Sequence, residues 1–323
     1  MALSDLAVFS EYAYDAMTEV LAQQVELFNE ASAGTINLSA AAHQGDYSER
    51  AFYAKISGLV RRRNAYGSGA VSPVNLEHLV DTMVKVAAGT PPVQLDPGQF
   101  RWIQQNPEVA GAAMGQQLAK DALADMLNTS VAATSAALAN VAAVTNDISA
   151  GSDGAELPSF TALSNTAMKF GDYNGLIAAW VLHSTVLGKL YNNALTNAQQ
   201  LFTYGTVNVI GDPFGRRFVV SDVPGLVVAG SPTKYRTLGL VPGAVVIDQN
   251  NDFEDNYETS NGDENIQRTY QAEWSFQLGI KGFSWDKSNG GKSPNDAAIL
   301  TATNWDRYAT SHKDLAGVVL ISQ

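Results

Sequence analysis

The clearest pattern of hydrophobic and polar positions lies between Ile266 and Lys281. Apolar residues occupy the even positions, with Arg268 as the exception, and polar residues or glycine occupy the odd ones. A period of two is that of a β-strand, so the pattern predicts one apolar face and one face exposed to water. About 16 residues at roughly 3.3 Å each give a strand on the order of 50 Å long, whereas ordinary strands have about 5–6 residues.

A second long element is predicted between Pro107 and Asn140. Asn106 is suited to cap this helix, Pro107 suits its first position, and Glu108 favours the positive end of the helix dipole. At roughly 1.5 Å per residue the helix would be about 50 Å long. Its many alanines would let other backbones approach closely, so the sequence predicts a spine with other elements laid across it.

Shorter patterns predict the other elements. Residues 3–29 have the spacing of one or two amphipathic helices, and two extended arms around a polar tip, 35–42 and 51–56, suggest a hairpin-like projection. A helix is expected from Ser72, as its N-cap, to Gly89. Later predictions are helices at 159–171 and 185–201 and strands at 177–183, 207–210, 218–221, 240–247 and 317–321. Helix, strand and helix in this order imply an α/β layer.

The composition indicates a folded, acidic protein. The chain has 323 residues, 46% of them hydrophobic, and a net charge of −12, so its surface as a whole repels nucleic-acid phosphates and anionic membranes. It has no cysteine, which excludes disulfides, thiolate nucleophiles and cysteine-bound metals. The acidic amino terminus is unlike a secretory signal, and polar residues interrupt the charge-free stretches 126–146 and 190–211. We therefore expect neither export nor a membrane span.

Few residues form a pattern with catalytic or ligand-binding chemistry. Gly290-Gly-Lys-Ser293 resembles the end of a phosphate-binding loop, but Asp286 stands where the first glycine is needed and Pro294 follows directly, which favours a surface turn. His183 and Ser184 could serve a hydrolase as base and nucleophile, although adjacent strand residues point to opposite faces. We expect no catalytic residue, no metal ligand and no cofactor.

Opposite charges are concentrated in two segments. Seven carboxylates lie between Asp248 and Glu264, but Phe253 and Thr259 stand where a calcium-binding EF-hand needs glycine and glutamate. This acidic segment is complementary in charge to the arginine triplet Arg61-Arg-Arg63. For these arginines, ion pairs between protein subunits are favoured over contact with nucleic acid. The candidate interface residues are Arg61, Arg62, Arg63, Asp252, Glu254, Asp255 and Glu258.

Several segments in the second half of the chain carry a resemblance through their order and spacing. They are Ala179-Trp-Val-Leu-His-Ser184 before a helix, Gly215-Arg-Arg-Phe-Val-Val-Ser-Asp-Val-Pro224, Asp252-Phe-Glu-Asp-Asn-Tyr257 before the long strand, and Ser293-Pro-Asn-Asp-Ala-Ala-Ile-Leu300 with Asn304-Trp-Asp-Arg307 and the closing apolar strand. Together they resemble the major capsid proteins of tailed bacteriophages, which have the Hong Kong 97 fold.

The resemblance implies an α+β fold of the Hong Kong 97 type with long elements and projecting arms. The implied division is an N-terminal arm (1–33), an extended loop (34–66), a peripheral domain (67–155) with its spine helix (107–140), an α/β axial domain (156–236), peripheral strands (237–288) and a C-terminal segment that returns to the axial domain (289–323).

The implied function is that of a head protein rather than an enzyme. Copies would assemble as hexamers and pentamers into an icosahedral shell around double-stranded DNA, without sequence-specific DNA binding and without a membrane. The expected partners are the chain itself, a portal protein, a separate scaffold protein if there is one, and decoration proteins. The expected location is the virion, after assembly in the cytoplasm of a bacterial host. Two alternatives stay open: an encapsulin-like nanocompartment shell with the same fold and, more distantly, a hydrolase.

Overall fold

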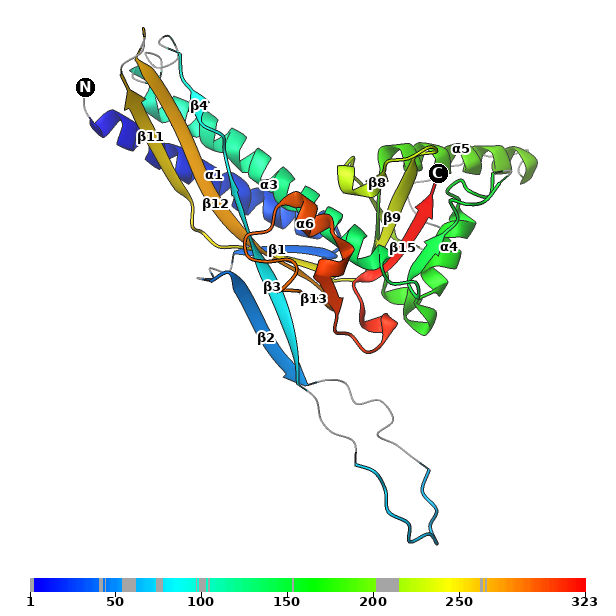
Figure 1. Cartoon of the computed structure of the whole chain (residues 1–323). Coiled ribbons are helices and arrows are strands. Elements are labelled where there is room, and N and C mark those ends of the chain that lie inside the picture. Colours follow the sequence, from blue (N-terminus) through cyan, green and yellow to red (C-terminus); the bar gives the residue numbers. More distant parts are fainter. Residues whose placement is uncertain are drawn as a thin grey trace.

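The fold is described from a computed structural model of the chain. The structure describes residues 3–40, 43, 45–53, 62–73, 78–96, 98, 103, 105–152, 154–201, 215–261, 264 and 266–323. These residues form two β-sheets with helices packed on them, and a hairpin that projects from one sheet (Figure 1).

The first sheet is built around one long strand, β12. Its nine described strands are β1 (Ile36–Ala40), β2 (Tyr47–Tyr53), β3 (His78–Gly89), β4 (Val93–Gln94), β10 (Val245–Gln249), β11 (Glu254–Ser260), β12 (Gln267–Ile280), β13 (Phe283–Trp285) and β14 (Trp305–Arg307). β12 pairs antiparallel with β3, β4, β10, β11 and β13, whereas β1 lies parallel to β10. The long strand predicted from the alternating pattern is therefore confirmed.

Only one face of β12 follows that prediction along its whole length. The even positions Tyr270, Phe276 and Leu278 are buried, as expected. The odd face was expected to be wet, but Ser275 and Gln277 are also buried, at 3% and 1% exposure. The prediction is wrong for this half of the wet face, because other segments cover it and form hydrogen bonds with Ser275 and with the amide nitrogen of Gln277.

Two long helices, α1 (Leu3–Ala31) and α3 (Pro107–Ala139), lie side by side along the first sheet (Figure 1). Both predictions are confirmed, although Asn106 precedes α3 without a side-chain capping hydrogen bond. The helices pack backbone against backbone at this point, since a Cβ added at Gly115 would lie 2.2 Å from the carbonyl oxygen of Ala13. Small residues on α3 thus allow the close approach predicted for a spine.

The second sheet has the strand order β5-β15-β9-β6-β7, with β8 paired to β9. Its strands are β5 (Thr145–Asp147), β6 (Ala179–Leu182), β7 (Arg217–Val220), β8 (Val227–Val228), β9 (Lys234–Leu240) and β15 (Gly317–Ser322). Helices α4 (Phe160–Met168) and α5 (Ser184–Leu201) flank it, which confirms the predicted α/β layer. The shorter helices are α6 (Asp296–Leu300) and the 3-10 turns η1 (Gly171–Leu176), η2 (Pro224–Leu226), η3 (Ala302–Asn304) and η4 (His312–Asp314).

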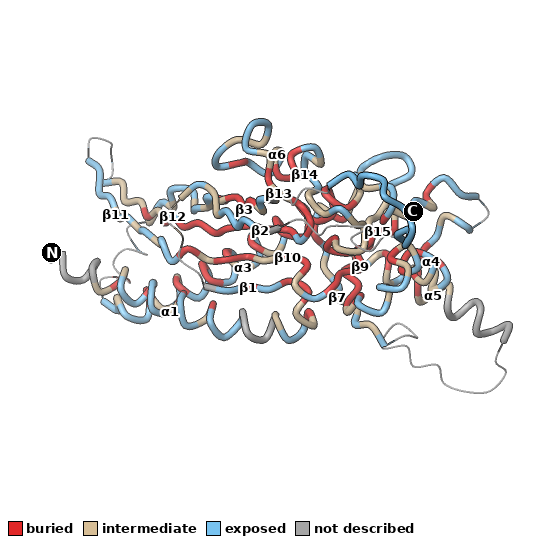
Figure 2. The backbone as a smooth tube through the Cα atoms, turned by 90° about the horizontal axis from the view of Figure 1, so that it is seen from below, coloured by how far each residue is buried: buried red, intermediate tan, exposed pale blue. Residues whose placement is uncertain are grey.

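The buried residues form one continuous band through both sheets (Figure 2). The band runs along the strands, and the outward faces of the helices are exposed. None of the described helices has the length and hydropathy needed to cross a lipid bilayer.

The segment between residues 34 and 89 differs from its prediction. The helix expected from Ser72 to Gly89 is wrong, because residues 78–89 form strand β3. The two predicted arms both contain strands, but these strands do not pair with each other: β1 joins β10 and β2 joins β3. The strand predicted at 207–210 lies outside the described residues.

The projecting hairpin therefore consists of β2 and β3 rather than β1 and β2. It extends away from the first sheet, and the exposed segment 62–73 lies at its far end (Figure 1).

Candidate subunit-interface residues

The acidic candidates lie on and before strand β11. Among the described strands, β11 pairs only with β12, so its other edge is open. Glu254 and Glu258 are exposed on this strand. Charged side chains on an open edge oppose pairing with an unrelated strand while they attract a basic partner.

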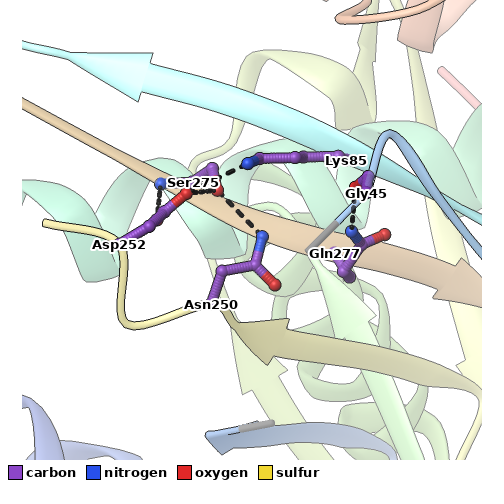
Figure 3. Close-up of polar contacts among 6 residues, drawn as sticks. All are labelled: Gly45, Lys85, Asn250, Asp252, Ser275 and Gln277. Carbon is purple, nitrogen blue, oxygen red and sulfur yellow. Dashed lines mark hydrogen bonds and ion pairs between the residues drawn. The ribbon is translucent and has the colours of Figure 1, made fainter. Parts of the chain in front are cut away.

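Asp252 has a different environment, since its carboxylate is bound within the chain (Figure 3). It accepts a hydrogen bond from the backbone N–H of Ser275 at 2.8 Å and another from the Ser275 hydroxyl, and Lys85 Nζ lies 3.1 Å away. Burial opposes ionisation of Asp252, but the hydrogen bonds from Ser275 and Lys85 outweigh it and keep the pKa below its usual value. Asp252 thus joins the loop after β10 to strands β12 and β3.

Further polar residues surround Asp252 on the face of β12 that carries the odd positions, which the sequence pattern predicted to be exposed to water. Asn250 donates to the Ser275 hydroxyl at 2.8 Å, and Gln277 donates to the carbonyl oxygen of Gly45 at 3.3 Å (Figure 3). Asn250 and Gln277 are 5% and 1% exposed. These bonds explain why polar residues in the predicted alternation are buried.

Asp255 also has partners within the chain. Its carboxylate accepts from the Ser10 hydroxyl at 2.6 Å and from the Tyr270 hydroxyl at 3.2 Å. Burial, together with the negative charge of Asp255, raises the pKa of Tyr270 far above its usual value. Asp255 therefore attaches α1 to the sheet, and Glu254 and Glu258 are the freely exposed acidic candidates.

The basic candidates lie far from the acidic ones within one subunit. Arg61 is outside the described residues, whereas Arg62 and Arg63 are exposed in the segment at the far end of the hairpin. Strand β11 lies at the opposite end of the molecule in Figure 1. The chain does not bring these charges together on its own, so an ion pair between them would need a second subunit.

The corner between β6 and α5 does not have the geometry of a serine hydrolase. His183 Nδ1 accepts a hydrogen bond from the backbone N–H of Thr185 at 3.1 Å. Hydrogen bonds from the Ser184 hydroxyl and backbone N–H lower the pKa of Asp222. Since the hydroxyl of Ser184 bonds to Asp222 and His183 Nδ1 is occupied, the pair resembles a helix-start arrangement more than a base and nucleophile.

The loop that contains Gly290-Gly-Lys-Ser293 carries ion pairs that the sequence analysis missed. Lys292 Nζ lies 2.9 Å from Asp46, and Lys287 forms an ion pair with Glu49 on β2. These partners are far apart in the sequence, and no local pattern marks them. In the part of the chain that the structure describes, no group of three or more His, Asp or Glu side chains could hold a metal ion.

The sequence profile that decides the family is the one described as "Major capsid protein 13-like", which matches residues 5–319. The chain belongs to this Gp13-like family. Major capsid proteins of tailed phages form heads, so this capsid protein is a structural component of the virion that assembles into the shell with copies of itself, and it is not an enzyme.

Solved structures agree with this major capsid protein assignment at the level of the fold. The capsid of cyanophage Pam1 is 11% identical over 89% of this chain and 88% of its own, with a TM-score of 0.52. The head of Helicobacter pylori bacteriophage KHP40 is 8% identical over 90% and 88%, with a TM-score of 0.50. The shared fold is an α+β fold of the Hong Kong 97 type with a long helix and mixed sheets.

Two further comparisons add little. An encapsulin complex from Synechococcus elongatus is 12% identical over 88% of this capsid protein and 84% of its own chain, but its TM-score of 0.47 is too low to support an argument. A search of curated proteins finds no match.

Proposed function

We propose that this major capsid protein assembles as hexamers and pentamers into an icosahedral shell that encloses double-stranded DNA. The observation that carries the proposal is the family match over residues 5–319, on a subunit with a hairpin that reaches beyond its own body. Many modest contacts give a stable closed shell, since each contact after the first forms within an existing assembly. The negative net charge would disfavour adhesion of packaged DNA to the protein.

In this proposal the chain divides into the parts that the capsid resemblance implies. Residues 1–33 are an N-terminal arm, 34–66 an extended loop, 67–155 and 237–288 the peripheral domain, and 156–236 with 289–323 the axial domain. Two observations refine the division: α1 packs on α3 of its own subunit, and the hairpin continues through β3. Portal, scaffold and decoration proteins would join the shell inside the host cytoplasm.

The proposed contact between subunits is an ion pair of the arginine triplet with the acidic β11 region of a neighbour. Arg62 and Arg63 are exposed at the hairpin's far end, and Glu254 and Glu258 are exposed on an open edge. Asp252 and Asp255 would add negative potential there while they keep their partners within the chain. Single exposed pairs contribute only about 0–1 kcal/mol, so the contact depends on its repetition around the shell.

The test replaces Arg61, Arg62 and Arg63 together by glutamate. The purified subunit should keep its circular dichroism spectrum and melting temperature, while electron microscopy should show no closed shells. Replacement of the three residues by lysine keeps the charge and should preserve shells. Charge reversal at Glu254 and Glu258, combined with the triple glutamate variant, should restore assembly. Normal shells from the triple glutamate variant alone would contradict the ion-pair contact.

The contents of native particles test the rest of the proposal. Particles with genomic DNA and a portal vertex support a phage head. Particles filled with a protein cargo would instead support a nanocompartment.

A further inference from the structure

The hairpin is joined to the first sheet through one strand, β3. Val84 pairs with Leu278 of β12 and also with Tyr47 of β2. On one side of Val84, residues 85–89 pair with β12, while on the other side residues 78–83 pair with β2. Val84 is therefore the point at which the hairpin leaves the body, and a bend there would change the angle of the whole projection.

At this point and on its hairpin side, the base of the hairpin contacts the body through Met83, which is buried against Gly279 of β12, and through several polar contacts. Lys287 forms an ion pair with Glu49, and Lys292 Nζ lies 2.9 Å from the carboxylate of Asp46. Lys287 Nζ also lies 5.2 Å from the ring centre of Tyr47. One hydrogen bond adds to these contacts, from the backbone N–H of Thr82 to the hydroxyl of Ser284 at 3.1 Å.

Both lysines come from a loop whose shape is fixed by its own residues. Asp286 accepts from the backbone N–H of Ser288 at 2.8 Å and of Asn289 at 3.2 Å. Gly290 lies against the ring of Trp285, because an added Cβ would come within 2.3 Å of it, and Trp285 donates to the carbonyl oxygen of Gly291 at 3.0 Å. The loop whose sequence resembles a phosphate-binding motif therefore holds Lys287 and Lys292 on a fixed backbone.

A rigid loop makes these ion pairs more effective than flexible surface pairs. One partner of each pair starts from a fixed backbone, so less conformational freedom is lost when the pair forms. The two pairs also act together on neighbouring positions of the hairpin, on either side of Tyr47. Since all four side chains are at least partly exposed, salt should weaken the contact.

We propose that the loop Asp286–Lys292 is an electrostatic latch that sets the angle between the β2–β3 hairpin and the body of the subunit. With the latch closed, Lys287 and Lys292 hold the base of the hairpin against the loop. With the latch open, the hairpin swings about Val84 while its own β2–β3 pairing stays intact. Its consequence for shell assembly rests on the proposed function, whereas the latch itself is a property of the single subunit.

The experiment measures the hairpin angle in unassembled full-length subunits. Since the chain has no cysteine, Ala51→Cys on β2 and Ala124→Cys on α3 provide two unique positions for spin labels, and both are exposed. The test variant is Lys287→Gln with Lys292→Gln. The matched control is Lys120→Gln with Lys281→Gln, two exposed lysines on the body, and melting curves establish that each variant is folded.

If the latch sets the hairpin angle, the distance distribution between the labels should be about twofold broader in the test variant than in wild type. The same broadening is expected for wild type in about 1 M salt, where the Debye length falls to about 3 Å. The control should retain the wild-type distribution. Exchanged charges, with Asp46→Lys and Glu49→Lys opposite Lys287→Glu and Lys292→Glu, should restore the narrow distribution.

Two results would overturn the latch: an unchanged distance distribution in the test variant, with or without broadening in Ser284→Ala, or an equal change in the control. A working latch in subunits that never form shells would contradict only the proposed function. Normal shells from subunits without a latch effect would contradict only the latch.

Discussion

The second sheet and the base of the hairpin differ in how far charged contacts contribute to them. In the second sheet, Trp180, Leu238 and Leu320 are fully buried, so apolar area removed from water stabilises it. At the hairpin base, Glu49 and Asp46 face lysines across partly exposed ion pairs. One chain thus combines a body stabilised mainly by apolar burial with a projection that, in the proposed latch, is positioned by charge.

The largest loss of folding stability is expected from a substitution in the second sheet. Trp180 is fully buried between strands, and Trp180→Ala should lower the free energy of unfolding by about 3–5 kcal/mol, because it removes apolar contacts and leaves a cavity. Urea denaturation measures the change. Tyr66→Ala is the matched aromatic control, since Tyr66 is 98% exposed and its removal should change the free energy little. Equal losses for both variants would contradict the assignment of stability to this core.

A smaller loss of stability is expected where α1 meets α3, from a glycine-to-alanine substitution that would usually stabilise a helix. Glycine to alanine in a helix normally stabilises it by about 0.5–1 kcal/mol. Gly188→Ala on α5 should follow this rule, because nothing lies within 4 Å of the added Cβ. Gly115→Ala should instead destabilise the protein by about 1–3 kcal/mol, because its Cβ would meet the Ala13 carbonyl oxygen at 2.2 Å. Thermal melting distinguishes the two, and stabilisation by both would show that the close helix contact is absent.

The smallest change in folding stability is expected for Asp81, a half-buried acidic residue on the hairpin itself. Burial raises the pKa of Asp81 to about 6, although Arg50 on the paired strand opposes the rise. Because the folded pKa lies above the usual value of an aspartic acid, Asp81 destabilises the protein above pH 6, and this penalty disappears as the pH falls towards 4. Asp81→Asn should therefore be more stable than wild type at pH 7.5, by about 1 kcal/mol after allowance for solvent screening.

The measurement is the difference in unfolding free energy between Asp81→Asn and wild type from pH 7.5 to 4. The difference should shrink to zero over this range, because the protonated aspartic acid and the asparagine are both neutral. A difference that stays constant with pH would mean that Asp81 acts through packing rather than through its charge.

The sequence predicted the elements with the strongest periodicity. β12 follows from a regular alternation, and α3 follows from a long alanine-rich stretch with Pro107 at its start. β3 was predicted as a helix because Ser72-Pro73 is a strong helix-start signal. Its own signal is the β-branched series Val80, Thr82, Val84 and Val86, which alternates with other residues as a strand does.

The contacts of the candidate site could not be predicted in the same way. Asp252 and Asp255 were grouped with Glu254 and Glu258 because a run of charge looks uniform in a sequence. Only the fold brings Ser275, Lys85 and Ser10 to two of the four carboxylates and leaves the other two exposed. Pairs such as Lys292 and Asp46 join distant strands, so no local pattern contains them.

Copies of this chain are proposed to close into a shell through contacts that include the projecting hairpin. Cryo-electron microscopy of particles formed by the full-length protein tests it most directly. We expect closed shells of hexamers and pentamers in which the segment 62–73 of one subunit lies on the β11 region of a neighbour. Monomers that never close into particles, or shells whose hairpins contact no other subunit, would contradict it.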